Sequence, residues 1–176
     1  MADDYIVYRD APPDAGAFEA RSRRIVEGLL AGGVDHVVGL PDNQSRLIYE
    51  MLSVHDRVRV VPICREGEAF AVASGLYAGG AKPAVVIQNT GLLESGDSLR
   101  GTAWEMGVPL VSVVGYRGFR TLGTDCVDSV ATLTEGTLQA WRIPYRIMEV
   151  DAEAEVLAWA LEQAESDHRP VVTLMP

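Results

Sequence analysis

The sequence predicts an α/β protein built on an open, doubly wound parallel sheet with helices on both faces. Segments in which apolar residues recur at helical spacing alternate with short apolar segments along nearly the whole chain. The short segments are continuous apolar runs, which is typical of parallel strands that are covered on both faces. Pairs of glycines follow two of the helical segments and are suited to ending a helix.

Residues 1–15 are polar and contain two adjacent prolines, which favours an N-terminal arm, and its segment Tyr5–Tyr8 could form an edge strand or contact a partner. Residues 16–31 are expected to form the first helix. Its inward residues at helical spacing are Phe18, Ile25, Val26, Leu29 and Leu30. Arg21, Arg23 and Arg24 lie between them and predict a solvated face.

Residues 34–40 are expected to form a strand that closes in a polar turn containing Pro41, Asp42 and Asn43. A helix over 45–53 follows. After the segment 58–80, strands are expected at 83–87, 109–114, 145–150 and 171–174, and helices at 96–106, 133–141 and 152–165. Residues 88–91 are expected to form a polar loop, and residues 115–128 a long functional or partner-contacting loop.

The segment at residues 58–80 is the most informative part of the chain. The β-branched run at 58–61 predicts a buried strand, and Cys64 at its end is expected to be a buried small hydrophobe. Residues 69–77 are rich in alanine, which predicts a helix that can approach another backbone or a flat ligand closely. Glu66 stands between them, where open α/β sheets bind ligands. The alternative interpretation is that Glu66 and Glu68 only favour the helix N-terminus through its dipole.

The chain has 176 residues, enough for one domain with a sizeable core. Its net charge of −10 argues against a nucleic-acid or anionic-membrane surface, because phosphate binding requires a basic patch. No apolar run is long enough to cross a bilayer, and acidic residues stand where a signal peptide carries positive charge, so a cytoplasmic protein is expected. The cysteines and histidines are too few and too scattered to predict a metal site.

Known phosphate and nucleophile motifs are absent from the sequence. There is no G-x-G-x-x-G, no G-x-x-x-x-G-K-[ST] and no G-x-S-x-G. Polar clusters instead follow several predicted strands, at residues 41–43, 65–66, 88–90 and 116–117. Since the carboxyl ends of parallel strands meet at one edge, these clusters indicate half of an active site, and the other half is missing from this chain.

Residues 65–78 resemble the pyrimidine-binding domain of thiamine-diphosphate enzymes. In that family a glutamate at the start of a small-residue helix is followed nine residues later by glycine, a spacing that Glu66 and Gly75 match and Glu68 does not. Residues 39–42 and 88–92 resemble the corresponding loop and strand end of the sulfopyruvate and phosphonopyruvate decarboxylase group. The resemblance covers residues 16–176, which are expected to form a single pyrimidine-binding domain.

The resemblance implies thiamine diphosphate with Mg²⁺ as cofactors and a small 2-oxo acid as substrate. Glu66 would hydrogen-bond the ring nitrogen of the aminopyrimidine and so promote loss of the thiazolium C2 proton, after which the cofactor acts as the electron sink for decarboxylation. Asp42 would relay protons, Asn43 would contact substrate, and Arg117 would pair with an anionic substrate or form a structural salt bridge. The residues implied to line the cofactor pocket with Glu66 are Pro41, Gln88, Asn89, Thr90 and Gly91.

The other domain of this family binds diphosphate through Mg²⁺ with a Gly-Asp-Gly motif followed by asparagines. The nearest string here is Gly-Asp-Ser at 96–98, and no asparagine follows Asn89. The resemblance therefore implies the α subunit of a split decarboxylase, active only with a β subunit that holds diphosphate and metal, in an α2β2 or larger assembly. Residues 90–95 and 118–128 depart from the family pattern, which leaves the substrate open.

Three other functions remain open at this point. The first is a carboligase of the same family, which would join the cofactor-bound fragment to an aldehyde or a second oxo acid. The second is a non-catalytic subunit that shapes or regulates a partner, and the third is a flavodoxin-like domain that binds a small ligand. In the non-catalytic interpretations, Glu66 would tolerate substitution.

Overall fold

The computed structural model describes residues 14–176. The helices are α1 (Ala15–Ala31), α2 (Arg46–Ser53), α3 (Ala69–Ala78), α4 (Asn89–Glu94), α5 (Ser129–Trp141) and α6 (Glu153–Asp167). The strands are β1 (His36–Gly39), β2 (Arg59–Pro62), β3 (Pro83–Gln88), β4 (Val111–Gly115), β5 (Tyr145–Ile147) and β6 (Val171–Met175). The short 3₁₀ turns η1 (Glu66–Glu68) and η3 (Phe119–Thr121) and the π-helical segment η2 (Asp97–Trp104) complete the elements. Most of the expected arm, with its edge strand at Tyr5–Tyr8, lies outside the described residues.

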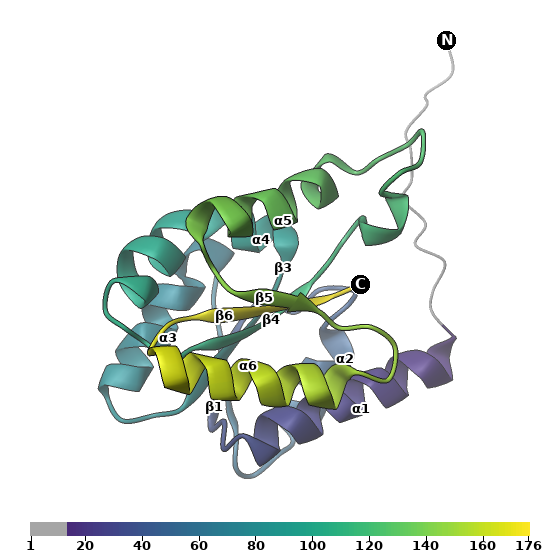
Figure 1. Cartoon of the computed structure of the whole chain (residues 1–176). Coiled ribbons are helices and arrows are strands. Elements are labelled where there is room, and N and C mark those ends of the chain that lie inside the picture. Colours follow the sequence, from purple (N-terminus) through teal and green to yellow (C-terminus); the bar gives the residue numbers. More distant parts are fainter. Residues whose placement is uncertain (1–13) are drawn as a thin grey trace.

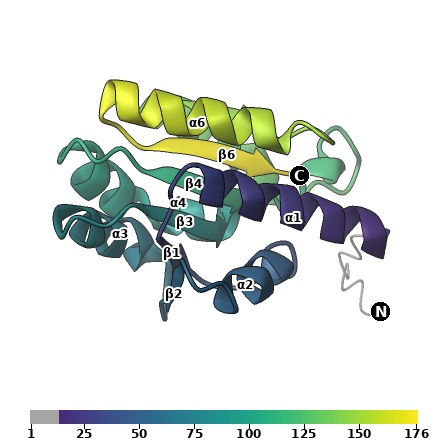
Figure 2. The same ribbon diagram turned by 90° about the horizontal axis from the view of Figure 1, so that it is seen from below.

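The six strands form one sheet in the order β2-β1-β3-β4-β6-β5, and every neighbouring pair is parallel. Helices α1, α2 and α6 cover one face, and α3, α4 and α5 cover the other (Figures 1 and 2). The first strand, β1, lies inside the sheet, and β2 lies on one side of it. The strands β3, β4, β6 and β5 follow on the other side of β1. The predicted doubly wound α/β fold is confirmed.

The strands are continuous apolar runs because both sides of the sheet are core. Successive residues of a strand point to opposite faces. In β3, Ala84 and Val86 belong to the core under α1, α2 and α6, whereas Val85 and Ile87 belong to the core under α3, α4 and α5. All four side chains are fully buried. At about 25 cal/mol per Å² of apolar surface removed from water, these two cores are the main source of stability.

The prediction of a buried strand at residues 58–61 is wrong. Within residues 14–176, strand β2 lies at the edge of the sheet and pairs only with β1. Arg59 and Pro62 are exposed, and Val60 and Val61 are half-buried. An edge strand tolerates a charged residue and a proline because one row of its backbone groups has no neighbouring strand. Cys64, which follows β2, is likewise exposed, so its predicted role as a buried hydrophobe is also wrong.

The predicted solvated face of the first helix is correct only for Arg23, which is exposed and pairs with Glu19 at 2.7 Å. Arg24 and Arg21 turn instead toward α6. Arg24 Nε lies 2.9 Å from Oε2 of Glu153, and Arg21 Nε lies 3.5 Å from its Oε1. Glu153 is fully buried, so it requires these cations as partners. The two arginines therefore join α1 to the first turn of α6.

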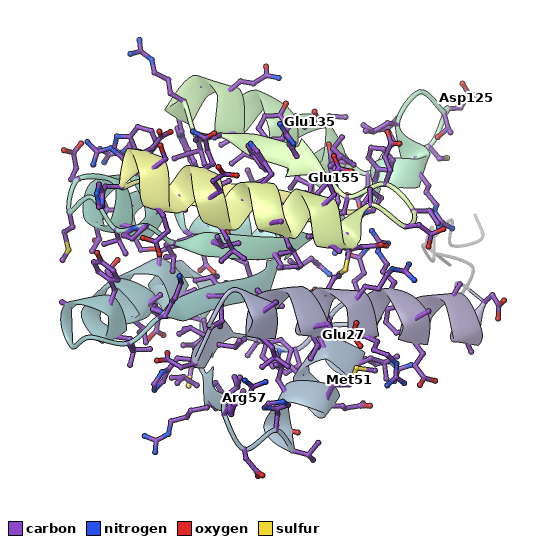
Figure 3. All side chains as sticks on the ribbon, turned by 60° about the horizontal axis from the view of Figure 1, so that its bottom comes forward. Glu27, Met51, Arg57, Asp125, Glu135 and Glu155 are labelled. Carbon is purple, nitrogen blue, oxygen red and sulfur yellow. The ribbon has the colours of Figure 1, made fainter. Side chains whose placement is uncertain are left out.

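The predicted loop at 88–91 is also wrong, because α4 begins directly at Asn89. The buried Asn89 amide donates to the carbonyl of Arg117 and to Oγ1 of Thr134, both at 3.0 Å. These contacts with distant segments stabilise a helical start that the local residue types do not favour. The predicted long loop after β4 is present and contains η3, and Asp125 lies at its outer end (Figure 3). Within residues 14–176, no helix is both long and apolar enough to span a membrane.

Candidate active site

The segments that follow β1, β2, β3 and β4 meet at the carboxyl edge of the sheet. Gly39 at the end of β1 is in register with Val86 of β3, and Gln88 at the end of β3 is in register with Gly115 of β4. The strands therefore end side by side, and the polar residues beyond them share one region. In Figure 1 this is the side toward which β6 and the C-terminus point. Open α/β sheets bind ligands at this edge.

Glu66 lies at this edge, at the start of η1. The chain leaves β2 in an extended conformation at Arg65 and then turns into the short helix that leads to α3. Glu66 is half-buried. Within residues 14–176 its carboxylate accepts no hydrogen bond and joins no ion pair, although the neighbouring Arg65 is ion-paired to Glu94. An unpaired carboxylate is thus held at the ligand-binding edge.

Gly91 lies directly against the side chain of Glu66. A Cβ built on Gly91 would come within 2.5 Å of both Cβ and Cγ of Glu66. Real Cβ atoms do not approach other atoms so closely, so only glycine admits Glu66 in this position. The structure therefore brings together Glu66 and Gly91, two residues that the sequence predicted for the cofactor pocket.

Asp42 organises the turn between β1 and α2. Its Oδ1 accepts hydrogen bonds from the backbone N–H of Gln44 at 2.8 Å and of Ser45 at 2.7 Å, and from Oγ of Ser45 at 2.9 Å. Its Oδ2 is buried without a partner within the described residues. Pro41 and Asn43 on either side are exposed. Asp42 thus fixes the loop between β1 and α2 through one oxygen.

Tyr49 of α2 bonds to strand β3 near the carboxyl edge. Its buried hydroxyl donates to the carbonyl of Val86 at 2.5 Å, and Gly39 leaves the space for this contact. Burial raises the pKa of Tyr49 far above its usual value, and the negative charges of Asp42 and Glu66 raise this pKa further. The hydrogen bond to Val86 joins α2 to β3 near the carboxyl edge.

The remaining predicted residues make mostly structural contacts. Thr90 donates to Oε1 of Gln88 at 2.7 Å. Asn89 turns away toward α5 and holds the loop after β4, although its Oδ1 is buried without a partner within residues 14–176. Arg117 Nε lies 3.0 Å from Oδ2 of Asp128, so the salt bridge that the sequence offered as one alternative is present.

Gln44, Glu94 and Ser95 are site residues that the sequence analysis missed. The Oε1 of Gln44 is buried without a partner within the described part of the chain, and a Cβ on Gly115 would lie 2.7 Å from it. Gln44 therefore reaches from the end of β1 to the end of β4. No local motif marks these residues, because their contacts depend on strand order rather than on spacing in the sequence.

The family model of the thiamine pyrophosphate enzyme N-terminal TPP binding domain matches residues 21–141. The chain belongs to this family. The resemblance that Glu66 and Gly75 indicated is thereby confirmed. For the thiamine pyrophosphate enzymes, this domain binds the cofactor.

Individual relatives are consistent with the thiamine pyrophosphate family. The chain is 29% identical over 133 residues to sulfopyruvate decarboxylase subunit alpha of Methanothermobacter thermautotrophicus, covering 76% of this chain and 81% of that protein. It is 25% identical over 155 residues to the subunit of the same name from Methanococcus maripaludis, covering 88% and 93%. A phosphonopyruvate decarboxylase of Streptomyces viridochromogenes is 30% identical over 94 residues, covering 53% of this chain and 24% of that protein.

The residues at the carboxyl edge fit the aminopyrimidine of the thiamine pyrophosphate cofactor. A ring nitrogen can pair with the carboxyl group of Glu66 when one of the two carries a proton, and the amino group can donate to a carboxylate or amide oxygen. Within residues 14–176, no group of three or more His, Cys, Asp or Glu side chains is arranged as metal ligands.

Proposed function

We propose that this chain is the α subunit of a thiamine-diphosphate-dependent 2-oxo acid decarboxylase of the sulfopyruvate or phosphonopyruvate type. The observation that carries the proposal is the unpaired carboxylate of Glu66 at the carboxyl edge of the sheet. Three relatives named sulfopyruvate decarboxylase subunit alpha support the substrate class and the subunit role. Residues 16–176 would form the pyrimidine-binding domain, preceded by an arm.

Glu66 would bind the ring nitrogen of the aminopyrimidine and exchange a proton with it. The half-buried position of Glu66 strengthens such a hydrogen bond, because water competes less for the carboxylate. Thiamine diphosphate, when bound, supplies the carbon nucleophile and the electron sink that decarboxylation of a 2-oxo acid requires. The Oδ2 of Asp42, which has no partner within the described residues, would carry a proton and transfer it to the product.

The other predicted residues would shape the pocket. Pro41, Gln88, Thr90 and Gly91 would line it, and Asn89 would act indirectly by holding the loop after β4. Asn43 and Arg117 would contact the substrate, with Arg117 attracting its anionic group while Asp128 orients the guanidinium. The relatives named "subunit alpha" support a partner subunit. This separate β subunit would hold the diphosphate and Mg²⁺, in an α2β2 or larger assembly.

The test compares Glu66→Gln with Glu68→Gln in the enzyme reconstituted with its β subunit, thiamine diphosphate and Mg²⁺. Both glutamates belong to η1, but Glu68 is exposed and lies off the motif spacing. We expect no CO₂ release by the chain alone and activity in the complex. Loss of the general acid–base group should lower kcat by about a hundredfold or more in Glu66→Gln and leave Glu68→Gln close to wild type.

Retention of full activity by Glu66→Gln would contradict the catalytic assignment. Sulfopyruvate and phosphonopyruvate are the substrates to compare, each with and without an acceptor aldehyde. Carboligation would be shown if adding the acceptor aldehyde gave a condensation product in place of the aldehyde that simple decarboxylation releases.

A further inference from the structure

Helix α4 contacts the turn that carries Glu66 through three residues on one face. Gly91, Glu94 and Ser95 are spaced three and four residues apart, so they point to the same side of the helix. Gly91 packs against the side chain of Glu66, Glu94 accepts the backbone N–H of Gly67, and Ser95 bonds to the carbonyl of Glu66. One short helix thus holds the backbone around the proposed cofactor-binding carboxylate.

Ser95 fixes the backbone of Glu66. Ser95 is fully buried, and its Oγ lies 2.8 Å from the carbonyl oxygen of Glu66 and 2.6 Å from that of Gly91. The Gly91 carbonyl already accepts the backbone N–H of Ser95 at 2.9 Å. The single hydroxyl hydrogen of Ser95 can therefore be donated to the carbonyl of Glu66. This hydrogen bond joins η1 to the end of α4.

Glu94 contacts the residues immediately before and after Glu66. One carboxylate oxygen is ion-paired to Nε of Arg65, and the other accepts the backbone N–H of Gly67 at 3.3 Å. This pairing raises the pKa of Arg65. The hydrogen bond to Glu94 is the larger cause, and the negative charge of Glu94 is the second. A guanidinium one residue from Glu66 could otherwise pair with Glu66 itself. Glu94 therefore keeps the carboxylate of Glu66 available.

We propose that Glu94 and Ser95 are positioning residues for Glu66. Ser95 sets the place of its backbone, and Glu94 holds Arg65 away from its carboxylate. The proposal rests on the proposed function of Glu66 toward the aminopyrimidine. Neither side chain needs to touch the cofactor, because both act on the turn of residues 65–67. A displacement of about 1 Å at a reacting group can cost on the order of a hundredfold in rate, so the loss of either contact should be measurable.

The test uses Ser95→Ala and Glu94→Gln in the complete complex, with two matched controls. Ser98→Ala removes another buried hydroxyl, which lies 3.1 Å from the carbonyl oxygen of Ser95. Asp97→Asn removes another surface ion pair, with Arg100 at 3.5 Å. The main measurement is the rate at which the C2 proton of bound thiamine diphosphate exchanges for deuterium, followed by NMR after acid quenching. The dissociation constant of the cofactor and the Tm are measured alongside.

We expect Ser95→Ala and Glu94→Gln to slow the exchange by about tenfold or more. The dissociation constant of the cofactor and the Tm should remain near those of the matched controls. The double variant Arg65→Gln with Glu94→Gln should recover most of the exchange rate, because the guanidinium that would neutralise Glu66 is then gone. A purely structural role of Glu94 would give no such recovery.

Exchange rates of both variants equal to those of the controls would overturn the proposal. Should Ser95→Ala fail to fold, Glu94→Gln and its double variant decide, since the side chain of Glu94 is partly exposed. Glu66→Gln measured in the same assay separates the two ideas. Slow exchange in Glu66→Gln with normal exchange in Ser95→Ala and Glu94→Gln rejects only the positioning role. Normal exchange in Glu66→Gln rejects the proposed function.

Discussion

The side chain of Glu66 crosses the backbone of Gly91 so closely that no methyl group fits between them. A Cβ at Gly91 would lie 2.5 Å from Cβ and Cγ of Glu66 and 2.9 Å from its Cδ. The turn after β2 and the helix after β3 therefore form one unit at the carboxyl edge of the sheet. The position of the glutamate is set by a residue that follows a different strand.

The substitution Gly91→Ala should displace Glu66. We expect the activity of the reconstituted enzyme to fall by about tenfold or more, because the carboxylate leaves its place. Forcing a methyl into this contact should also lower the unfolding free energy by about 1–3 kcal/mol. Steady-state kinetics and urea unfolding measure the two effects separately.

The matched control is Gly136→Ala on α5, a helical position where an added Cβ meets no atom within 4 Å. It should raise the unfolding free energy by about 0.5–1 kcal/mol, because alanine favours the helix. Wild-type activity in Gly91→Ala would show that Glu66 does not depend on this contact.

The substitution Tyr49→Phe should change how stability depends on pH. At neutral pH it removes the hydrogen bond to Val86 and should cost about 1 kcal/mol. In the folded wild type, burial and then the charges of Asp42 and Glu66 raise the Tyr49 pKa above the ordinary value of 10.0. The stabilisation by neutral Tyr49 is thus present below about pH 10 and is lost as pH rises toward the raised pKa.

The difference in unfolding free energy between wild type and Tyr49→Phe should therefore be smaller at about pH 11 than at about pH 8. Urea unfolding at both pH values measures it. Tyr77→Phe, at an exposed position on α3, is the control and should change the unfolding free energy little. An advantage of wild type that grows with pH would contradict a raised pKa of Tyr49.

Removing the charge of Glu153 should destabilise the contact between α1 and α6. Glu153 is fully buried, and Arg24 and Arg21 lie 2.9 and 3.5 Å from it. Breaking a buried ion pair costs about 3–5 kcal/mol, and we expect Glu153→Gln near the lower end because both arginines keep some access to water. Urea unfolding measures the loss.

Glu155 also lies in the first turn of α6 and is exposed, as Figure 3 shows. Glu155→Gln should cost about 0.3–1 kcal/mol through the helix dipole alone. Equal losses in Glu153→Gln and Glu155→Gln would show that the buried pairing adds nothing to stability.

Thiol labelling should report where the β subunit binds. Cys64 and Cys126 are both exposed, so a thiol reagent should label both rapidly in the isolated chain without denaturant. Cys64 lies two residues before Glu66, and a subunit that completes the cofactor site should slow its labelling. The variant Cys126→Ser isolates the signal of Cys64, and Cys64→Ser isolates that of Cys126.

Slow labelling of Cys64 in the isolated chain would contradict its exposure. Labelling that stays rapid in the complex would place the β subunit away from this edge of the sheet.

Much of the fold and the central candidate could be predicted from the sequence because the relevant patterns are local. The run Ala84–Ile87 is apolar at every position, and this alone indicates a strand covered on both faces. Glu66 precedes a small-residue helix at a spacing that also marks the family, and the family match confirms the family assignment. Helix periodicity likewise identified α1, and the run of small residues identified α3.

The contacts between distant segments could not be predicted in this way. Val58–Val61 has the composition of a core strand, yet strand order places β2 at the edge. Arg21 and Arg24 have the spacing of a solvated face, yet α6 packs beside them and brings the buried Glu153. Both errors arise because residue pattern describes a segment but not its neighbours.

The sequence by itself thus determined a doubly wound α/β domain with a glutamate at a strand end, since hydrophobic periodicity and motif spacing are properties of short segments. The tertiary structure alone decided that Gly91, Glu94 and Ser95, which follow β3, contact the turn that carries Glu66. The physical reason is that the packing of strands side by side, rather than their order along the chain, sets which side chains meet.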